Sequence, residues 1–203
     1  GNAGIISGND TICVNGTTDL NSNGDIGGSW SSNNTSVATV NSVSGLVTGG
    51  SAGSAIITYT ITGAMGCPDV STDTTIVVNE LPMATIAFSN VAVCAGETAK
   101  FTITGTSDAQ ITYKLNGGMD VIALLDAMGE YVVNVPSVFA DVTLTLVKVK
   151  ILSTDCESVI NLDSTVMVNF PSSSTQTTTE CDMYTWSANG NTYMASGTYM
   201  AIL

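Results

Sequence analysis

The sequence predicts an all-β protein built from tandem sandwich modules, and three observations support this prediction. Serine, threonine, valine, glycine and asparagine dominate a chain of 203 residues, of which only 10% are charged. Such a composition is typical of short strands and tight turns. Two short motifs recur in the same order along the chain, and five cysteines are spread widely enough to cross-link small modules with thin apolar cores.

The recurring motifs mark the module boundaries. Residues 12–17 read Ile-Cys-Val-Asn-Gly-Thr, and residues 93–98 read Val-Cys-Ala-Gly-Glu-Thr. Strand-like runs at 76–82 and 166–171 each end with asparagine and then proline, which cannot donate a hydrogen bond to a sheet. The expected modules are residues 1–82, residues 83–171 and an incomplete third β repeat at residues 172–203.

Short runs of alternating polar and apolar residues predict the strands of each module. About seven such strands in each full module predict an immunoglobulin-like β-sandwich. Residues 120–128 can also be read as a helical turn, but Gly129 and the flanking strands disfavour that reading. Asn116-Gly117-Gly118 predicts a hairpin, because these residues tolerate positive φ. The clearest predicted strands are residues 36–40, 53–60, 99–104, 110–115, 131–135 and 142–149.

The five cysteines fit one disulfide inside each full module. The expected pairs are Cys13–Cys67 and Cys94–Cys156, which leave Cys181 unpaired or intermolecular. Each bridge would contribute about 4 kcal/mol in the chain-entropy model, and persistent disulfides indicate an oxidising compartment. The alternative is five reduced, buried cysteines. None of the cysteines forms a C-x-x-C pair, so the spacing does not indicate a zinc site.

Charge and hydropathy exclude several classes of function. The net charge is −13, with four lysines and no histidine, so we expect no nucleic-acid binding. The absence of histidine removes the common nucleophile–base systems, and we expect no catalytic residues and no enzyme. The longest purely apolar run, residues 121–125, is far below the roughly 20 residues of a bilayer span, so we expect no membrane insertion.

One segment resembles the start of a calcium loop. Asp19, Asn21, Asn23 and Asp25 place oxygen ligands at alternating positions around a glycine. The twelfth position is Trp30 instead of glutamate, and no flanking helices are predicted. The alternative is an Asn/Gly-rich loop between two strands, with Trp30 in the core. Apart from this calcium candidate, we expect no cofactor.

Residues 30–40, 44–49 and 52–59 resemble the group 2 bacterial immunoglobulin-like domain. The second module resembles the cysteine-containing Ig-like repeats of very large surface proteins of Bacteroidota, and residues 180–199 resemble the opening of another such repeat. The resemblance implies export by the type IX route and a role in adhesins, gliding proteins or surface filaments. In those repeats a second cysteine follows shortly, which would account for the unpaired Cys181.

Three tripeptides resemble the O-glycosylation acceptor of Bacteroidota, an aspartate followed by serine or threonine and then an apolar residue or threonine. The candidate acceptors are Thr11, Thr74 and Ser164. A surface glycan at these positions would add solubility and protease resistance.

We therefore expect a non-catalytic structural or adhesive repeat region of a secreted bacterial cell-surface protein, forming a disulfide-stapled stalk or fibre. Its partners would be neighbouring modules of the same protein or identical subunits, with a surface or glycan as a further target. One alternative is a filament subunit completed by strand addition from a neighbouring chain. Another is a carbohydrate-binding accessory module of a secreted enzyme, with the tail aromatics stacking on sugar rings.

Overall fold

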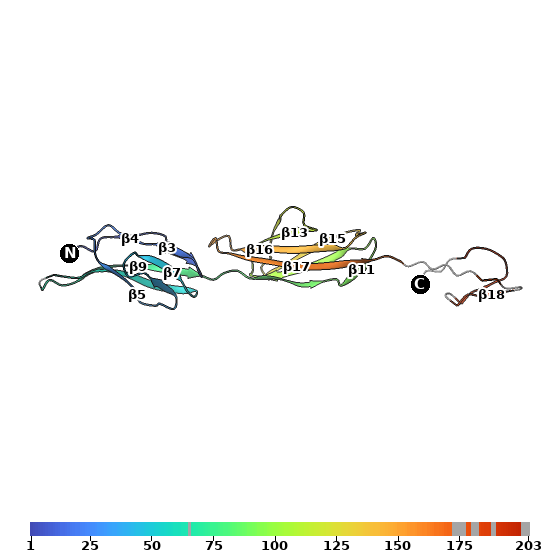
Figure 1. The fold of residues 1–203 in the computed structure, drawn as a ribbon, viewed down its shortest axis with the longest axis horizontal. Helices are drawn as coiled ribbons and strands as arrows, with labels where there is room; N and C mark the ends of the chain where they lie inside the picture. Colours follow the sequence, from blue (N-terminus) through green and yellow to red (C-terminus); the bar gives the residue numbers. More distant parts are fainter. Residues whose placement is uncertain (65, 172–177, 180–182, 188–189, 200–203) are drawn as a thin grey trace.

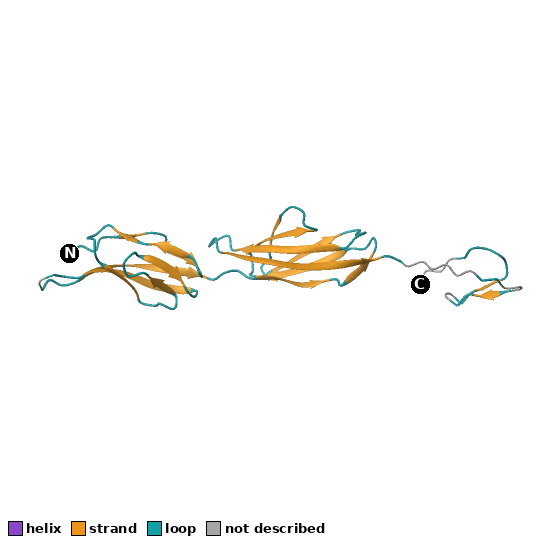
Figure 2. Ribbon diagram, viewed as in Figure 1, coloured by secondary structure: helices purple, strands orange, loops and turns teal. Residues whose placement is uncertain are grey.

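The computed structural model describes the chain except residues 65, 172–177, 180–182, 188–189 and 200–203. The described residues form strands and loops only (Figure 2), and they contain no helix long and apolar enough to cross a membrane. Two β-sandwiches lie end to end, and a small hairpin follows them (Figure 1). The predicted all-β fold of tandem immunoglobulin-like sandwiches is confirmed.

The first sandwich packs a four-stranded sheet, β2-β9-β8-β5, against a three-stranded sheet, β3-β7-β6, and a short β1-β4 pair lies beside them. All neighbours pair antiparallel except β2 and β9, which run parallel. The strands are β1 Ile6–Ser7, β2 Thr11–Cys13, β3 Thr17–Asp19, β4 Asn21–Ser22, β5 Ser29–Ser32, β6 Ala38–Val40, β7 Leu46–Gly49, β8 Gly53–Ile61 and β9 Val70–Asn79.

Alternation along the strands produces the first core. In β8 the side chains of Ala55, Ile57 and Tyr59 point inward while their neighbours face solvent or the edge. The Trp30 ring lies 4.7 Å from the Tyr59 ring, centroid to centroid, and only 6% of Trp30 is exposed. The expectation that Trp30 is a core residue is confirmed.

The second sandwich has longer strands and a larger core. A five-stranded sheet, β11-β17-β16-β13-β14, packs on a three-stranded sheet, β10-β12-β15. Its interior is filled by side chains such as Phe101, Ile103, Ile111 and Leu144, all fully buried. The strands are β10 Ala84–Ser89, β11 Ala92–Cys94, β12 Ala99–Gly105, β13 Gln110–Leu115, β14 Val121–Leu124, β15 Glu130–Val135, β16 Val142–Lys150 and β17 Glu157–Asn169.

The hairpin predicted at Asn116-Gly117-Gly118 joins β13 to β14. Asn116 and Gly117 have φ values of 50° and 68°, the left-handed conformation that this turn requires. Residues 121–124 therefore return along β13 as a strand, in register from Tyr113↔Val121 to Gln110↔Leu124. The disfavoured helical turn at residues 120–128 is not formed, because pairing with β13 supplies the backbone hydrogen bonds of that segment.

In the tail, the described residues form a single short hairpin. Strand β18 Tyr184–Thr185 pairs antiparallel with β19 Thr192–Tyr193. The Tyr193 and Tyr199 rings lie 3.8 Å apart, centroid to centroid. Cys181 lies outside the described residues.

Candidate functional site at the junction of the two sandwiches

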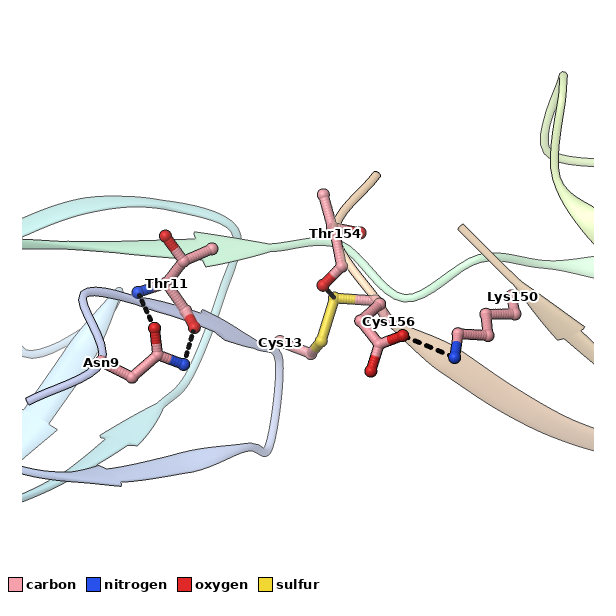
Figure 3. The surroundings of a disulfide bond; sticks show 7 residues. Asn9, Thr11, Cys13, Lys150, Thr154 and Cys156 are labelled. Atoms are coloured by element: carbon pink, nitrogen blue, oxygen red, sulfur yellow. Dashed lines mark hydrogen bonds and ion pairs between the residues drawn. A yellow bond between two sulfur atoms is a disulfide. The ribbon is translucent and has the colours of Figure 1, made fainter. Parts of the chain in front are cut away.

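A disulfide bond connects the two sandwiches. Cys13 of the first sandwich is bonded to Cys156 of the second, with their Cα atoms 5.7 Å apart (Figure 3). Cys67 and Cys94 are free thiols at exposed positions. The predicted pairs Cys13–Cys67 and Cys94–Cys156 are therefore wrong. Each predicted pair lies within one module, whereas the bond in the structure joins a cysteine of the first module to a cysteine of the second.

The strand geometry explains why the pairs within modules do not form. Cys13 lies opposite Asn79, the last residue of β9, whereas Cys67 precedes Val70, the first residue of that strand. Strand β9 has 10 residues, so these two positions lie at opposite ends of the sandwich, about 30 Å apart at roughly 3.3 Å per residue. A disulfide requires Cα atoms within about 7 Å.

The second sandwich repeats this separation. Cys94 lies opposite Asn169 at the end of β17, and Cys156 precedes Glu157 at its beginning. The strand has 13 residues, which corresponds to about 43 Å at the same rise. In both sandwiches the two cysteines therefore lie at opposite ends.

Cys13 reaches the junction because of its strand pairing. Strand β2 runs parallel to β9, and β9 leads directly into the linker to the second sandwich. The tight turn after Cys13 closes with a hydrogen bond from Gly16 N–H to the Cys13 carbonyl oxygen, 2.8 Å, and contains Asn15 at φ 65°. This turn ends β2 at the face of the first sandwich that looks toward the second.

Cys156 lies in the loop that joins β16 to β17, and this loop points back toward the first sandwich (Figure 3). Ile151 N–H donates to the Cys156 carbonyl oxygen at 2.9 Å, and Asp155 has φ 62°, so the loop is tightly folded. Cys156 itself is fully buried. Its sulfur is bonded to that of Cys13, a residue that is half-buried.

Two ion pairs flank the Cys156 loop. Lys150 Nζ lies 2.5 Å from Asp155 Oδ1, and Lys148 Nζ lies 2.9 Å from Glu157 Oε2. The hydrogen bond and charge of Asp155 raise the pKa of Lys150 above its ordinary value of 10.5. Both pairs are solvent-exposed, so they orient the loop more than they stabilise the fold.

The disulfide and the linker are the principal connections between the sandwiches. The two hydrophobic cores share no residue, and within the described part of the chain no hydrogen bond or ion pair joins one sandwich to the other. A shallow groove at the junction is lined from both sides, by Asn9, Thr11, Gly16 and Thr17 of the first sandwich and by Thr154 and Asp155 of the second. The relative position of the sandwiches therefore depends on a covalent bond and not on a packed interface.

The side chains of the calcium candidate are partly engaged by backbone groups of the N-terminal segment. Asn23 Oδ1 accepts a hydrogen bond from Ile5 N–H at 2.7 Å, and Asp25 Oδ2 accepts one from Asn2 N–H at 2.9 Å. Asp19 ends β3 and Asn21 begins β4. No group of three acidic, cysteine or histidine side chains suited to a metal gathers among the described residues, and calcium binding here stays a prediction.

The three glycosylation candidates differ in exposure. Thr11 is exposed beside the junction, whereas Thr74 and Ser164 are half-buried in β9 and β17. The Ser164 hydroxyl also exchanges a hydrogen bond of 2.8 Å with the Ser89 hydroxyl. Glycosylation stays a prediction, with Thr11 as the most accessible acceptor.

Comparison with known proteins finds likeness in fold alone. No family model and no curated protein matches the sequence. Among solved structures, the chain resembles fibronectin(III)-like modules of CbhA from Clostridium thermocellum, with 12% identity, a TM-score of 0.37, and coverage of 81% of this chain and 93% of that one. A titin I-band fragment, I67-I69, is 13% identical at a TM-score of 0.43, with 79% and 62% covered. Drosophila N-cadherin EC1-4 is 16% identical at a TM-score of 0.36, with 80% and 47% covered.

Proposed function

We propose that this chain is a non-catalytic structural repeat region of a secreted bacterial cell-surface protein, in which Ig-like modules are joined end to end into a stalk or fibre. The modules would be residues 1–82 and 83–171, with residues 172–203 as part of a third. The observation that supports this function is the Cys13–Cys156 bond, because it joins the facing ends of two consecutive sandwiches. An oxidising, extracellular location follows from a persistent disulfide.

The bond changes how the chain would respond to tension. Force applied along the polypeptide passes from Cys13 directly to Cys156 through the sulfur atoms, so residues 14–155 lie outside the path that carries the force. Both hydrophobic cores are formed mainly by residues of this bypassed segment. A stalk built in this way keeps a limited length even when its modules unfold, which is the property that a surface fibre under shear requires.

The acidic surface suits the same role. The net charge of −13 makes neighbouring fibres repel one another and keeps them soluble. The group 2 Ig-like and Bacteroidota resemblance would add an export route and surface anchorage. Neighbouring modules or identical subunits would be the immediate partners, and a glycan or other surface would be the target.

Single-molecule stretching tests this function. With the disulfide intact, unfolding of both sandwiches should release only residues outside the bonded loop. In Cys156→Ser the segment between the cysteines, a sequence separation of 143, should extend as well and add about 480 Å at roughly 3.4 Å per residue. Cys67→Ser is the matched control, because it removes an exposed free thiol and should leave the extension unchanged. Equal extensions in the wild-type chain and Cys156→Ser would contradict the proposal, and binding to a glycan array would favour the carbohydrate-binding alternative.

A further inference from the structure

The backbone hydrogen bonds around Cys94 repeat those around Cys13. Cys13 lies opposite Asn79 at the end of β9, and Cys94 lies opposite Asn169 at the end of β17, both in parallel register. The residue after each cysteine donates its N–H to the carbonyl oxygen of that asparagine, at 3.0 Å from Val14 and 2.9 Å from Ala95. The two cysteines therefore occupy the same position on equivalent strand ends.

The turns that follow are equivalent too. The N–H groups of Gly16 and Glu97 donate to the carbonyl oxygens of Cys13 and Cys94, at 2.8 Å and 3.0 Å. Asn15 and Gly96 hold the positive φ of each turn, 65° and 89°. The backbone that presents Cys13 to its partner is thus already formed around Cys94, whose side chain is exposed.

Cys67 and Cys156 form the second equivalent pair. Each lies in the loop that joins the two longest neighbouring strands of its sandwich, β8 to β9 in the first and β16 to β17 in the second. Cys156 is bonded, whereas Cys67 is free and exposed. The described residues therefore contain one completed junction and two unpaired cysteines that match its two halves.

The two free halves face in opposite directions along the molecule. The loop between β8 and β9 extends away from the second sandwich, and β11 lies at the end of the second sandwich that is remote from the first (Figure 1). This placement prevents a bond between Cys67 and Cys94 of one chain. It leaves each exposed thiol open to a partner outside these two sandwiches.

We propose that Cys67 and Cys94 are the unpaired ends of a continuous series of inter-module disulfides. In this series the cysteine at the strand end of each Ig-like module bonds the cysteine in the hairpin loop of the next Ig-like module. In the Cys13–Cys156 junction, Cys13 is the strand-end member and Cys156 the hairpin-loop member. The partner of Cys94 is then a residue equivalent to Cys67, and the reverse holds for Cys67. The inference rests on the proposed stalk function and names the partner that extends it.

The chemistry of the bond is thiol–disulfide exchange with a small disulfide such as oxidised glutathione. The Cys67 thiolate attacks one sulfur of glutathione disulfide, which forms a mixed disulfide and releases one glutathione thiolate. The Cys94 thiolate of another copy of the chain then attacks the Cys67 sulfur and releases the second glutathione. Two protein thiols are oxidised, one glutathione disulfide is reduced, and the two thiol protons end on glutathione.

The test uses the 203-residue chain carrying Cys181→Ser, incubated folded and concentrated in a buffer of oxidised and reduced glutathione, then resolved by electrophoresis without reductant. We expect a ladder of covalent dimers, trimers and longer species. Peptide mapping should find Cys67 joined to Cys94 and Cys13 still joined to Cys156. An equimolar mixture of the chain with Cys67→Ser and the chain with Cys94→Ser should stop at dimers, because each has only one open end.

Other outcomes overturn the inference in distinguishable ways. Dominant Cys67–Cys67 or Cys94–Cys94 dimers, a chain that remains monomeric, or a Cys94–Cys181 bond within the chain that retains Cys181 would each show that Cys94 does not take a hairpin-loop cysteine. If Cys13–Cys156 is intact in the same digest, only the series of inter-module disulfides fails. If that bond is also absent, the proposed stalk function fails with it. The same ladder formed in urea would show that folded geometry plays no part.

Discussion

The two sandwiches share a plan but contribute opposite ends of it to their junction. The first provides a strand-end cysteine, Cys13, and keeps its loop cysteine free, whereas the second provides its loop cysteine, Cys156, and keeps its strand-end cysteine free. The second sandwich also has longer strands and all four lysines, while the first has the Trp30–Tyr59 pair at its centre. This difference shows that neither sandwich can form the cross-link by itself, because each one positions only one of the two bonded cysteines.

The largest effect that would test this comparison comes from removing the shared bond. In Cys13→Ser the single loop that the bond closes is lost, so the sandwich that unfolds first should lose about 4 kcal/mol of unfolding free energy, and the two transitions together should lose about 5 kcal/mol in the chain-entropy model. Chemical denaturation, followed by Trp30 fluorescence in a Trp186→Phe background and by circular dichroism for the second sandwich, measures both transitions. Cys67→Ser should leave both transitions in place, and unchanged transitions in Cys13→Ser would show that the bond does not restrain the unfolded chain.

The next effect separates the two cores. Phe101 is fully buried in the second sandwich and Ile57 in the first, so Phe101→Ala should cost about 3–5 kcal/mol and Ile57→Ala about 2–5 kcal/mol. Because the cores share no residue, each substitution should move only its own transition. With the disulfide reduced, any shift of the Trp30 fluorescence transition in Phe101→Ala would mean that the sandwiches unfold as one unit.

A smaller effect concerns a hydrogen-bond pair found in the first sandwich. The Tyr59 hydroxyl donates to the Asp25 carbonyl oxygen and accepts from Gly28 N–H, both at 2.9 Å, and it secures the loop that precedes β5. Tyr59→Phe keeps the ring against Trp30 but leaves these backbone groups without that partner. We expect a loss of about 1–3 kcal/mol, measured by denaturation of the first sandwich, and an unchanged midpoint would show that water replaces the hydroxyl without cost.

The smallest effect comes from the exposed ion pair beside Cys156. The pKa of Lys150 is raised in the folded protein, so its contribution to stability is complete below the ordinary lysine value of 10.5 and is lost as pH rises through the folded pKa. Asp155→Asn should therefore lower stability slightly at neutral pH and make no difference at strongly alkaline pH. Thermal unfolding of both proteins across this range measures it, and a difference that grows with pH would contradict the assigned direction.

Much of the local structure could be predicted from residue patterns. Alternation located β12, β13, β15 and β16 to within a residue or two, and the Asn116-Gly117-Gly118 turn was correctly identified. The short strands of the first sandwich were harder to bound, since β6 is Ala38–Val40 within the longer predicted run of residues 36–40. Asn34 accounts for the difference, because its carbonyl oxygen accepts the N–H groups of Val37 and Ala38 and turns the chain there.

The cysteine pairing was mispredicted because the prediction did not consider how far apart the two cysteines of one module lie in the fold. Each module carries one cysteine before its first hairpin and one before its last long strand. Once that last strand pairs in parallel with the first motif, the two cysteines must lie at opposite ends of it. The length of that last strand, β9 or β17, is several times the distance that a disulfide can span, so the two cysteines of one module cannot pair.

The amino-acid sequence by itself determined the class of the protein, its strands and its turns, because alternation and turn chemistry act between residues that are close along the chain. Only the tertiary structure decided which sulfur meets which, since that depends on parallel pairing between segments far apart in sequence and on two sandwiches facing each other end to end. A disulfide forms only where two cysteines lie within bonding distance, and the folded structure determines which cysteines do.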